Sequence, residues 1–378
     1  MKKIAIIGAS YLQLPLIRKA KEMGLETHVF AWAANDVGEK EADFFYPISI
    51  IEKEQILAKC REIGISGICS ISSDLAMITV NYVANSLDLT GNSLEATSLS
   101  TNKHLMRKRF DACGDPSPKS ILVDTIRDLD GISLRYPLIV KPTDRSGSRG
   151  VTEVFSFDQL GKAIEAANQQ GFEKKALVEE YAEGKEYSVE YISWHGQHFF
   201  LAVTQKFTTG TPHFIETGHL QPAALSDNML QKIKQVVTHA LDSLKITEGA
   251  SHTELKIDDD DNIRIIEIGG RMGGDCIGSS LVPLSTGVDF VRAVIEVSLG
   301  LEPQLVRPVK HNAAGVRFVF NQKDLDCLER LKREHPELLV EESVKKPDNN
   351  EISDSSARFG FFVFSAATTD LLKPYLPE

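Results

Sequence analysis

The chain has 378 residues, of which 42% are hydrophobic and 25% are charged. This length suggests two or three domains, and the composition is close to that of globular proteins, which excludes a disordered, collagen-like or coiled-coil chain. Lysine and arginine number 42 against 53 aspartate and glutamate residues, a formal net charge of −11. Because nucleic-acid binding needs concentrated positive charge, no nucleic-acid partner is expected.

The sequence gives no signal for export or for a membrane anchor. No apolar run approaches the ~20 residues that cross a bilayer, and Gln13 and Arg18 interrupt the apolar stretch near the start without a cleavage pattern after it. The five cysteines are scattered and form no Cys-x-x-Cys pair, which argues against a disulfide framework and a structural zinc site. We therefore expect a cytoplasmic protein without a membrane partner.

Strand and helix signals alternate over the first hundred residues. Apolar runs predict strands at 3–7, 26–30 and 67–71, and a helical spacing of apolar residues predicts a helix at 12–23. Strands separated by helices form a parallel sheet. The turn after the first strand lacks the second and third glycines of a dinucleotide fingerprint, so a nicotinamide site is the weakest alternative.

The pattern changes after about residue 116 to a mixed α+β arrangement. The turn His195-Gly196 joins two strands and predicts a hairpin. The predicted strands are 137–141, 151–155, 176–181, 187–194 and 198–205, and the predicted helices are 157–168 and 227–244. Residues 301–378 carry several further strands with polar turns.

The loop Asp144–Gly150 is rich in glycine and serine, which lets backbone amides converge on phosphate groups. It lies between two predicted strands, and its lysine, Lys141, comes before it, so it is not a P-loop. A hairpin lid over a nucleotide fits better. The alternative is an ordinary surface turn.

Two glutamates, Glu254 and Glu267, flank an acidic turn. If residues 259–262 form that turn, positions whose numbers sum to 521 pair, and the two side chains face each other with Cβ atoms ~5 Å apart. Like charges at that separation need a positive partner, and Mg²⁺ bridging nucleotide phosphates suits such oxygen ligands. The alternative is a solvated hairpin face.

The segment Gly269–Asp275 follows directly and contains four glycines around Arg271. Small residues let a ligand approach the backbone, and the arginine supplies a fork of donors for a carboxylate or phosphate. The alternative role of Arg271 is an ion pair with a structural carboxylate.

The chain resembles the ATP-grasp superfamily over essentially its whole length. The resemblance is carried by the joint order of Lys103, Lys141, the Gly/Ser loop, Glu179-Glu180-Tyr181, Glu186, Glu254 and Glu267-x-x-x-Arg271. It is similar above all to the carboxylate–amine ligases that include L-amino acid ligases, with biotin carboxylase and the purine-synthesis carboxylases more distant.

The resemblance implies a fold of class α/β and α+β. A Rossmann-like pre-ATP-grasp domain is expected at residues 1–100, and an ATP-grasp domain at 101–300 with a mobile lid at about 116–180. An α+β subdomain at 301–378 is expected to complete the ATP-grasp region.

The resemblance also implies how ATP is bound. Lys103 and Lys141 are the expected phosphate-binding lysines, and compact ammonium groups suit that role. Glu186 is expected to accept the ribose hydroxyls. The remaining expected ATP-binding residues are those of the lid loop and of the strand that meets adenine: Ser146, Gly147, Ser148, Gly150, Glu179, Glu180, Tyr181 and Ala182.

The same resemblance implies a metal site and an arginine beside the reacting phosphate. Glu254 and Glu267 are the expected ligands of Mg²⁺, with Mn²⁺ as an alternative, and Arg271 is expected to face an acyl phosphate. Many members have asparagine two residues after the second metal glutamate, where this chain has Gly269. The number of metal ions is therefore left open.

The stretch Phe214–Pro222 resembles the Glu-x-Gly-His-x-x-Pro segment that amino acid ligases use at their substrate pocket. Glu216 is expected to hold an ammonium group, and His219 to position a carboxylate or act as a base. The alternative is that both are ordinary loop residues.

These implications predict an ATP-dependent, ADP-forming ligase that joins a small carboxylate, such as an amino acid, to an amine or a thiol through an acyl phosphate. Lys141 and Arg271 are its expected catalytic residues, and the family's habit suggests a homodimer. The rival functions are a carboxylase that phosphorylates bicarbonate, a non-catalytic ATP-binding module and a nicotinamide-dependent oxidoreductase.

Overall fold

The fold is described from a computed structural model of the chain, which covers residues 1–145, 147, 149–211, 214–306, 312–345 and 358–377. The described part combines a parallel sheet with two antiparallel sheets, which confirms the predicted class of α/β and α+β. No helix in these ranges is both long and apolar enough to cross a membrane.

The N-terminal sheet is parallel, as predicted, and its strand order is β3-β2-β1-β4. The strands β1 and β2 are almost completely buried because helices cover both faces of the sheet. The strands are β1 (Lys3–Ile7), β2 (Glu26–Phe30), β3 (Phe44–Tyr46) and β4 (Gly67–Cys69). The helices of this part are α1 (Leu14–Glu22), α2 (Val37–Glu41), α3 (Lys53–Ile63) and α4 (Asp74–Ser86).

Two further helices connect this part to the rest of the chain. They are α5 (Leu94–Thr101) and α6 (Lys103–Cys113). Asn102 ends α5 and caps α6, because its side-chain oxygen accepts hydrogen bonds from the backbone amides of His104 and Leu105. This cap places Lys103 at the first position of α6.

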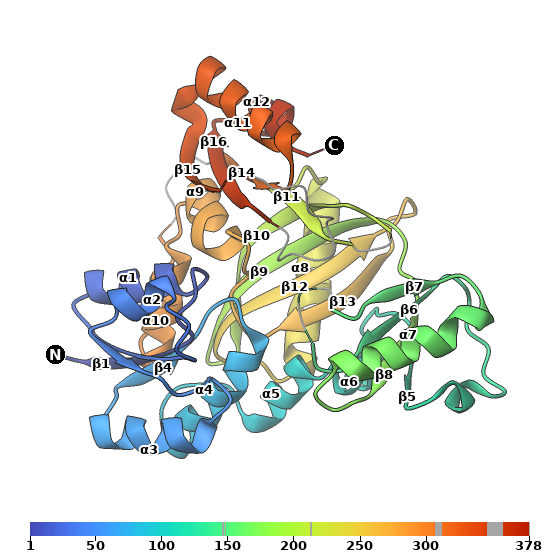
Figure 1. Cartoon of the computed structure of the whole chain (residues 1–378), viewed down its shortest axis with the longest axis horizontal. Coiled ribbons are helices and arrows are strands. Elements are labelled where there is room, and N and C mark those ends of the chain that lie inside the picture. The colour runs from blue at the N-terminus through green and yellow to red at the C-terminus, as the bar shows by residue number, and fades with distance from the viewer. Residues whose placement is uncertain (146, 148, 212–213, 307–311, 346–357, 378) are drawn as a thin grey trace.

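Residues 120–180, which fall in the region predicted to be the lid and are here called the lid, form an antiparallel sheet of order β5-β8-β6-β7 with two helices packed on it. Its strands are β5 (Ser120–Val123), β6 (Leu138–Pro142), β7 (Thr152–Val154) and β8 (Ala176–Glu180), and its helices are η1 (Ile126–Leu129) and α7 (Phe157–Gln170). Figure 1 shows the lid in green on the opposite side of the molecule from the blue N-terminal sheet.

The largest sheet has eight antiparallel strands in the order β13-β12-β9-β10-β11-β14-β16-β15. The strands are β9 (Lys185–Trp194), β10 (Gln197–Thr208), β11 (Glu216–Gln221), β12 (Gly249–Ile257), β13 (Ile263–Gly269), β14 (Ala313–Val319), β15 (Leu339–Val344) and β16 (Gly360–Ala366). The predicted hairpin at His195-Gly196 joins β9 to β10. Strands from residues 313–366 therefore continue the sheet that residues 185–269 begin.

The remaining helices cover this sheet or link it to the other parts. They are α8 (Asp227–Ser243), η2 (Ile277–Leu281), α9 (Val282–Thr286), α10 (Phe290–Ser298), α11 (Gln322–Glu334), η3 (Pro336–Leu338), α12 (Thr369–Leu372) and η5 (Lys373–Tyr375). The helix α8 buries its apolar face on β9, β12 and β13.

The helix α10 packs against the N-terminal part although it lies about 220 residues beyond β4 in sequence. Phe290 and Val294 share one core with Ile4 and Leu16, and Ile192 of the large sheet joins the same cluster. The N-terminal sheet is thus fixed to the large sheet through a common apolar core. The predicted domain boundaries at residues 100 and 300 stay predictions.

Candidate active site

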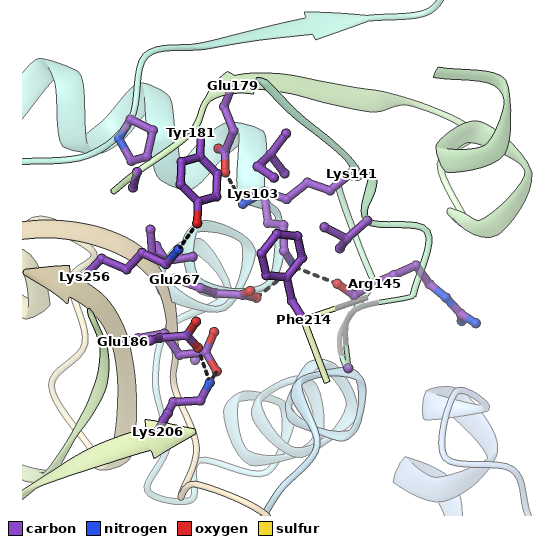
Figure 2. A pocket seen from close by; sticks show the side chains of 18 of the residues that line it. Lys103, Lys141, Arg145, Glu179, Tyr181, Glu186, Lys206, Phe214, Lys256 and Glu267 are labelled. Carbon is purple, nitrogen blue, oxygen red and sulfur yellow. Dashed lines mark hydrogen bonds and ion pairs between the residues drawn. The ribbon is translucent and has the colours of Figure 1, made fainter. Parts of the chain in front are cut away.

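A solvent-open cavity of about 1040 Å³, here called the first cavity, lies between the lid and the large sheet. Residues from α6, from the lid strands β6 and β8, and from the large-sheet strands β9, β12 and β13 line it. Figure 2 shows their labelled side chains converging from these separate elements. The predicted site residues among them are Lys103, Lys141, Gly147, Glu179, Glu180, Tyr181, Ala182, Glu186, Glu216, Glu254, Glu267 and Arg271.

Lys103 reaches from the start of α6 towards both the lid and the large sheet. Its Nζ donates to the backbone carbonyl of Arg145 at 2.6 Å and to Glu267 Oε1 at 2.8 Å, and the residue is only 6% exposed. A predicted phosphate-binding lysine is thus paired with a predicted metal-binding carboxylate.

Lys141 on β6 is held in a buried charge network with Glu179 on β8 and Arg107 on α6. Lys141 Nζ donates to Glu179 Oε1, and Arg107 Nε donates to Glu179 Oε2 at 3.0 Å. Burial by itself would raise the pKa of Glu179, but Arg107 and Lys141 outweigh it and lower that pKa. Burial lowers the pKa of Lys141 despite Glu179. Glu179 therefore already has two cationic partners, Lys141 and Arg107. Its predicted contact with adenine stays a prediction.

Glu254 and Glu267 lie directly opposite each other on β12 and β13, as the sequence predicts. The register near the turn differs from the prediction, because Leu255 pairs with Ile265 and Ile257 with Ile263. A bulge at Ile266 inserts one residue and restores the predicted pairing at the two glutamates. Both carboxylates thereby line the first cavity.

Lys206 on β10 forms ion pairs with three carboxylates at once. Its Nζ lies 2.6 Å from Glu186 Oε1, 2.8 Å from Glu254 Oε1 and 3.6 Å from Glu216 Oε1. Burial would lower the pKa of Lys206, but the carboxylates outweigh it and raise that pKa well above its usual value. Lys206 in turn is the main reason that the pKa of Glu254 lies well below its usual range despite burial.

His252 on β12 is clamped between two glutamates. Its Nδ1 is hydrogen-bonded to Glu190, and its Nε2 lies 3.4 Å from Glu254 Oε1. Burial would lower the pKa of His252, but Glu190 and Glu254 outweigh it and raise that pKa to about 9, so the imidazole is protonated near neutral pH. This arrangement fixes the orientation of the Glu254 side chain.

The lid end of the first cavity has the apolar and aromatic surface that a nucleobase needs. Ile139, Val151 and Ile266 line it, together with Tyr181 and Phe214. The Nζ of Lys256 lies 4.3 Å from the centroid of the Tyr181 ring and donates to its hydroxyl at 3.1 Å. Figure 2 shows Lys256 beneath Tyr181, on the same side of the cavity as Glu186.

The Gly/Ser loop is anchored at its base. Asp144 accepts hydrogen bonds from the backbone amides of Phe172 and Glu173 at 3.0 and 2.8 Å. Gly147 lines the first cavity, whereas Gly150, with a φ of +72°, packs beside Gln170 and Pro142 and does not line it. Ser146 and Ser148 lie outside the described residues.

Arg271 is held by Asp74 at the start of α4. Arg271 Nε and Nη2 each donate to a carboxylate oxygen of Asp74 at 2.9 Å, so the pair is bidentate. A Cβ at position 269 would lie 2.4 Å from Asp74 Oδ1. The glycine at the place of the usual asparagine is therefore required by the Asp74–Arg271 pair.

A second cavity of about 1320 Å³ adjoins the first. Both are lined by Gly147, Lys206, Glu216, His252, Glu254 and Arg271. His219, which is 1% exposed, lines only the second cavity, and burial is the main reason that its pKa lies well below its usual value. The two predicted substrate residues, Glu216 and His219, are thus brought to one cavity.

The sequence interpretation missed several residues of these cavities. Lys206 falls one residue beyond the strand predicted at 198–205, and a lone lysine at the end of an uncharged strand is the signal that was available. Asp74 and Arg358 lie about 200 and 90 residues from Arg271 in sequence, so no local spacing pointed to them.

Within the described ranges, no group of three or more His, Cys, Asp and Glu side chains is arranged to hold a metal ion. The pair Glu254 and Glu267 nevertheless offers the hard oxygen ligands that Mg²⁺ takes when substrate phosphates and water complete its shell. The donor set therefore fits a metal that arrives with a nucleotide rather than a metal caged by the protein alone.

Comparison with known proteins is consistent with this geometry. Residues 134–279 match the family model of the ATP-grasp domain. The chain is 27% identical over 293 residues to alanine–anticapsin ligase of Bacillus subtilis, which covers 68% of this chain and 61% of that protein. It is also 27% identical over 223 residues to D-alanine–D-alanine ligase B of Pseudomonas syringae pv. tomato, covering 55% of this chain and 66% of that one.

The solved structure of an L-amino acid ligase from Bacillus licheniformis superposes with a TM-score of 0.84 at 25% identity. The superposition covers 99% of this chain and 96% of that one. The chain spans about three fifths of the length of the alanine–anticapsin ligase that it matches.

Proposed function

We propose that the chain, whose residues 134–279 match the ATP-grasp domain, is an ADP-forming ligase that joins a small carboxylate to an amine through an acyl phosphate. The observation that carries the proposal is the convergence of Lys103, Lys141, Glu254 and Glu267, from four different elements, on one cavity. The names of the relatives point to amino acids as the substrates.

Mg·ATP would supply the transferable phosphoryl group and the cation that screens its charge. The residues of the chain would bind Mg·ATP by exchanging their present ion-pair partners for it. Lys103 would leave Glu267 for a phosphate oxygen, and Lys141 would leave Glu179, which keeps Arg107. Glu254 and Glu267 would then hold the metal, and Glu186 would accept from the ribose hydroxyls. Each charged side chain thus has a partner both with and without the nucleotide, which avoids an unpaired buried charge.

Arg271 lines both cavities, so we assign to it the stabilisation of the charge that develops when the carboxylate becomes an acyl phosphate. Asp74 holds the guanidinium in place through two hydrogen bonds. Glu216 and His219 would position the substrates in the second cavity. The lid loop, through Gly147, borders both cavities, and its closure would keep water from the acyl phosphate.

The first experiment is a screen of amino acid pairs for release of ADP and phosphate in the presence of Mg²⁺. We expect at least one pair to stimulate release well above either amino acid alone. Release that requires bicarbonate and no amine would support a carboxylase instead. ATP binding without turnover under every substrate set would support a non-catalytic module.

A first prediction concerns Glu267→Gln, which removes one negative ligand but keeps the side-chain volume. Loss of several kcal/mol of charge stabilisation should lower kcat for ADP release by about 100-fold or more. The matched control is Asp259→Asn, an exposed carboxylate in the turn of the same hairpin, which should retain normal turnover. Near-normal ADP release by Glu267→Gln would contradict the metal assignment.

The predicted homodimer and cytoplasmic location stay predictions.

A further inference from the structure

Both predicted metal ligands are paired with ammonium groups in the structure. Lys103 Nζ donates to Glu267 Oε1 at 2.8 Å, and Lys206 Nζ donates to Glu254 Oε1 at 2.8 Å. Figure 2 shows Lys103 hydrogen-bonded to Glu267 and to the backbone of Arg145. A metal ion bound to the two carboxylates would therefore share each of them with a positive charge of the protein.

The two lysines differ in what a metal ion would leave them. Lys206 also lies 2.6 Å from Glu186 Oε1 and 3.6 Å from Glu216 Oε1, so it keeps carboxylate partners if a metal ion binds Glu254. The side chain of Lys103 is only 7% exposed, and among the described residues no carboxylate except that of Glu267 lies within ion-pair distance of it. A metal ion at Glu267 would leave this buried ammonium group with a neutral acceptor, the Arg145 carbonyl.

The same ion pair opposes the binding of a phosphate group without a metal ion. A phosphate oxygen that takes the ammonium group of Lys103 would leave Glu267 without a cationic partner in the described part of the chain. The carboxylate would then lie near a second negative charge, which is unfavourable in a partly buried site. A metal ion that bridges Glu267 and the phosphate removes both penalties, because each charge then has a partner.

Lys141, the other expected phosphate-binding lysine, has no such link to the metal site. Its partner is Glu179, which is not an expected metal ligand and which Arg107 also holds at 3.0 Å. Lys141 can therefore move to a phosphate oxygen while Glu179 keeps a cation and the metal ligands keep theirs. The geometry thus distinguishes Lys103 from Lys141.

We propose that Lys103 is an autoinhibitory contact, which blocks the metal site at Glu267 until a nucleotide phosphate takes its ammonium group. The metal ion and the nucleotide then bind tightly only together. Because such coupling is reciprocal, the contact also disfavours a nucleotide that arrives without a metal ion. The inference rests on the proposed function for the identity of the two ligands, but it does not depend on turnover.

The first test is the binding of Mn²⁺ to the full chain without nucleotide, measured from the electron paramagnetic resonance signal of the free ion. Lys103→Met should bind Mn²⁺ about tenfold or more tightly than wild type, because no ammonium group then competes for Glu267. The matched control is Lys256→Met. It removes a positive charge from the same cavity, but Lys256 contacts the hydroxyl and ring of Tyr181 and is paired with neither metal ligand.

The control should gain less Mn²⁺ affinity than Lys103→Met does. An unchanged or lower affinity of Lys103→Met would overturn the inference, and so would an equal gain in the two variants.

The second test does not require Lys103→Met to fold. A non-hydrolysable ATP analogue is titrated calorimetrically into Glu267→Gln, once with EDTA and once with Mg²⁺. With EDTA the variant should bind the analogue about tenfold more tightly than wild type, because Lys103 is free and no carboxylate repels the phosphates. With Mg²⁺ it should bind more weakly than wild type, because the metal ion has lost a ligand.

This reversal separates the proposed contact from general damage to the site, which would weaken binding under both conditions. Weaker or unchanged binding by Glu267→Gln with EDTA would overturn the inference. The control Asp259→Asn should bind the analogue like wild type under both conditions.

The outcomes also separate this inference from the proposed ligase reaction. The expected changes in Mn²⁺ and analogue binding, without ADP release by any substrate pair, would support the Lys103 contact and contradict the ligase. ADP release together with an unchanged Mn²⁺ affinity of Lys103→Met would do the reverse.

Discussion

Lys206 shows how a single residue controls the charge balance of the two cavities. It is 7% exposed and lies between Glu186, Glu254 and Glu216. Removing one partner of a buried ion pair leaves an uncompensated charge, which is more costly than never having had the pair. The lysine therefore lowers the pKa of Glu254 and keeps this predicted metal ligand ionised.

For Lys206→Met we predict a loss of about 3–5 kcal/mol in the free energy of unfolding at pH 7. In wild type the pKa of Glu254 is lowered in the folded state, so its pairing contributes stability above the ordinary carboxyl pKa and loses it as the pH falls. Without Lys206, burial would raise the pKa of Glu254, and protonation of Glu254 would then favour the folded state. The loss should thus be smaller at pH 5 than at pH 7.

The measurement is urea denaturation of wild type and variant at both pH values, each compared at the same pH. Lys162→Met, which removes an exposed lysine of α7, serves as the control and should change stability by less than about 0.5 kcal/mol. A loss that is equal at pH 5 and pH 7 would contradict the role assigned to Lys206.

At the scale of secondary-structure elements, α6 connects the lid to the large sheet. Arg107 on this helix donates to Glu179 on β8 of the lid and, through Nη2, to the Ile266 carbonyl on β13 at 2.6 Å. Ile266 is the bulge residue beside Glu267, so the same arginine supports both the lid and the local shape of the glutamate pair. The position of the lid thus depends on a side chain outside the lid.

We predict that Arg107→Met weakens binding of a non-hydrolysable ATP analogue by about tenfold, because Glu179 would then have only Lys141 as a partner and would compete with phosphate for it. Stability should fall by about 1–3 kcal/mol as the Ile266 carbonyl loses its donor. Arg109→Met is the matched control on the same helix, since Arg109 donates to the Ser243 carbonyl and does not line the first cavity. Equal ATP affinities of the two variants would refute this account.

At the scale of the whole molecule, the N-terminal sheet and the large sheet share one core. Phe290 of α10 is 0% exposed and packs in the cluster that contains Ile4, Leu16 and Ile192. The second cavity is lined both by Tyr11 of the N-terminal part and by Glu216 of the large sheet. Its shape therefore depends on this shared core.

We predict that Phe290→Ala lowers the free energy of unfolding by about 3–5 kcal/mol through loss of apolar burial and creation of a cavity. Phe157→Ala, at a phenylalanine of α7 that is 57% exposed, should change it by no more than about 0.5 kcal/mol. Urea denaturation monitored by circular dichroism measures both. A separate early transition of the N-terminal part in wild type would show that the shared core does not couple the two sheets.

Much of the site followed from the sequence because it depends on local patterns. An assumed turn at residues 259–262 predicted a hairpin, and counting back from that turn placed Glu254 opposite Glu267. The count was wrong near the turn by one residue, and the bulge at Ile266 compensated for it. A bulge depends on the neighbouring strand and on Arg107, so local spacing did not predict it.

The sequence by itself determined the strongly patterned strands and helices, such as β1, β9 and α8, and the order of the charged residues along the chain, because apolar periodicity and turn chemistry act over a few residues. Only the tertiary structure decided which charges meet, because electrostatic partners are chosen by distance in space. It paired Lys206 with three carboxylates, Asp74 with Arg271 above a glycine that leaves room for the pair, and Arg358 with Asp275. Those pairings give the two cavities their charge.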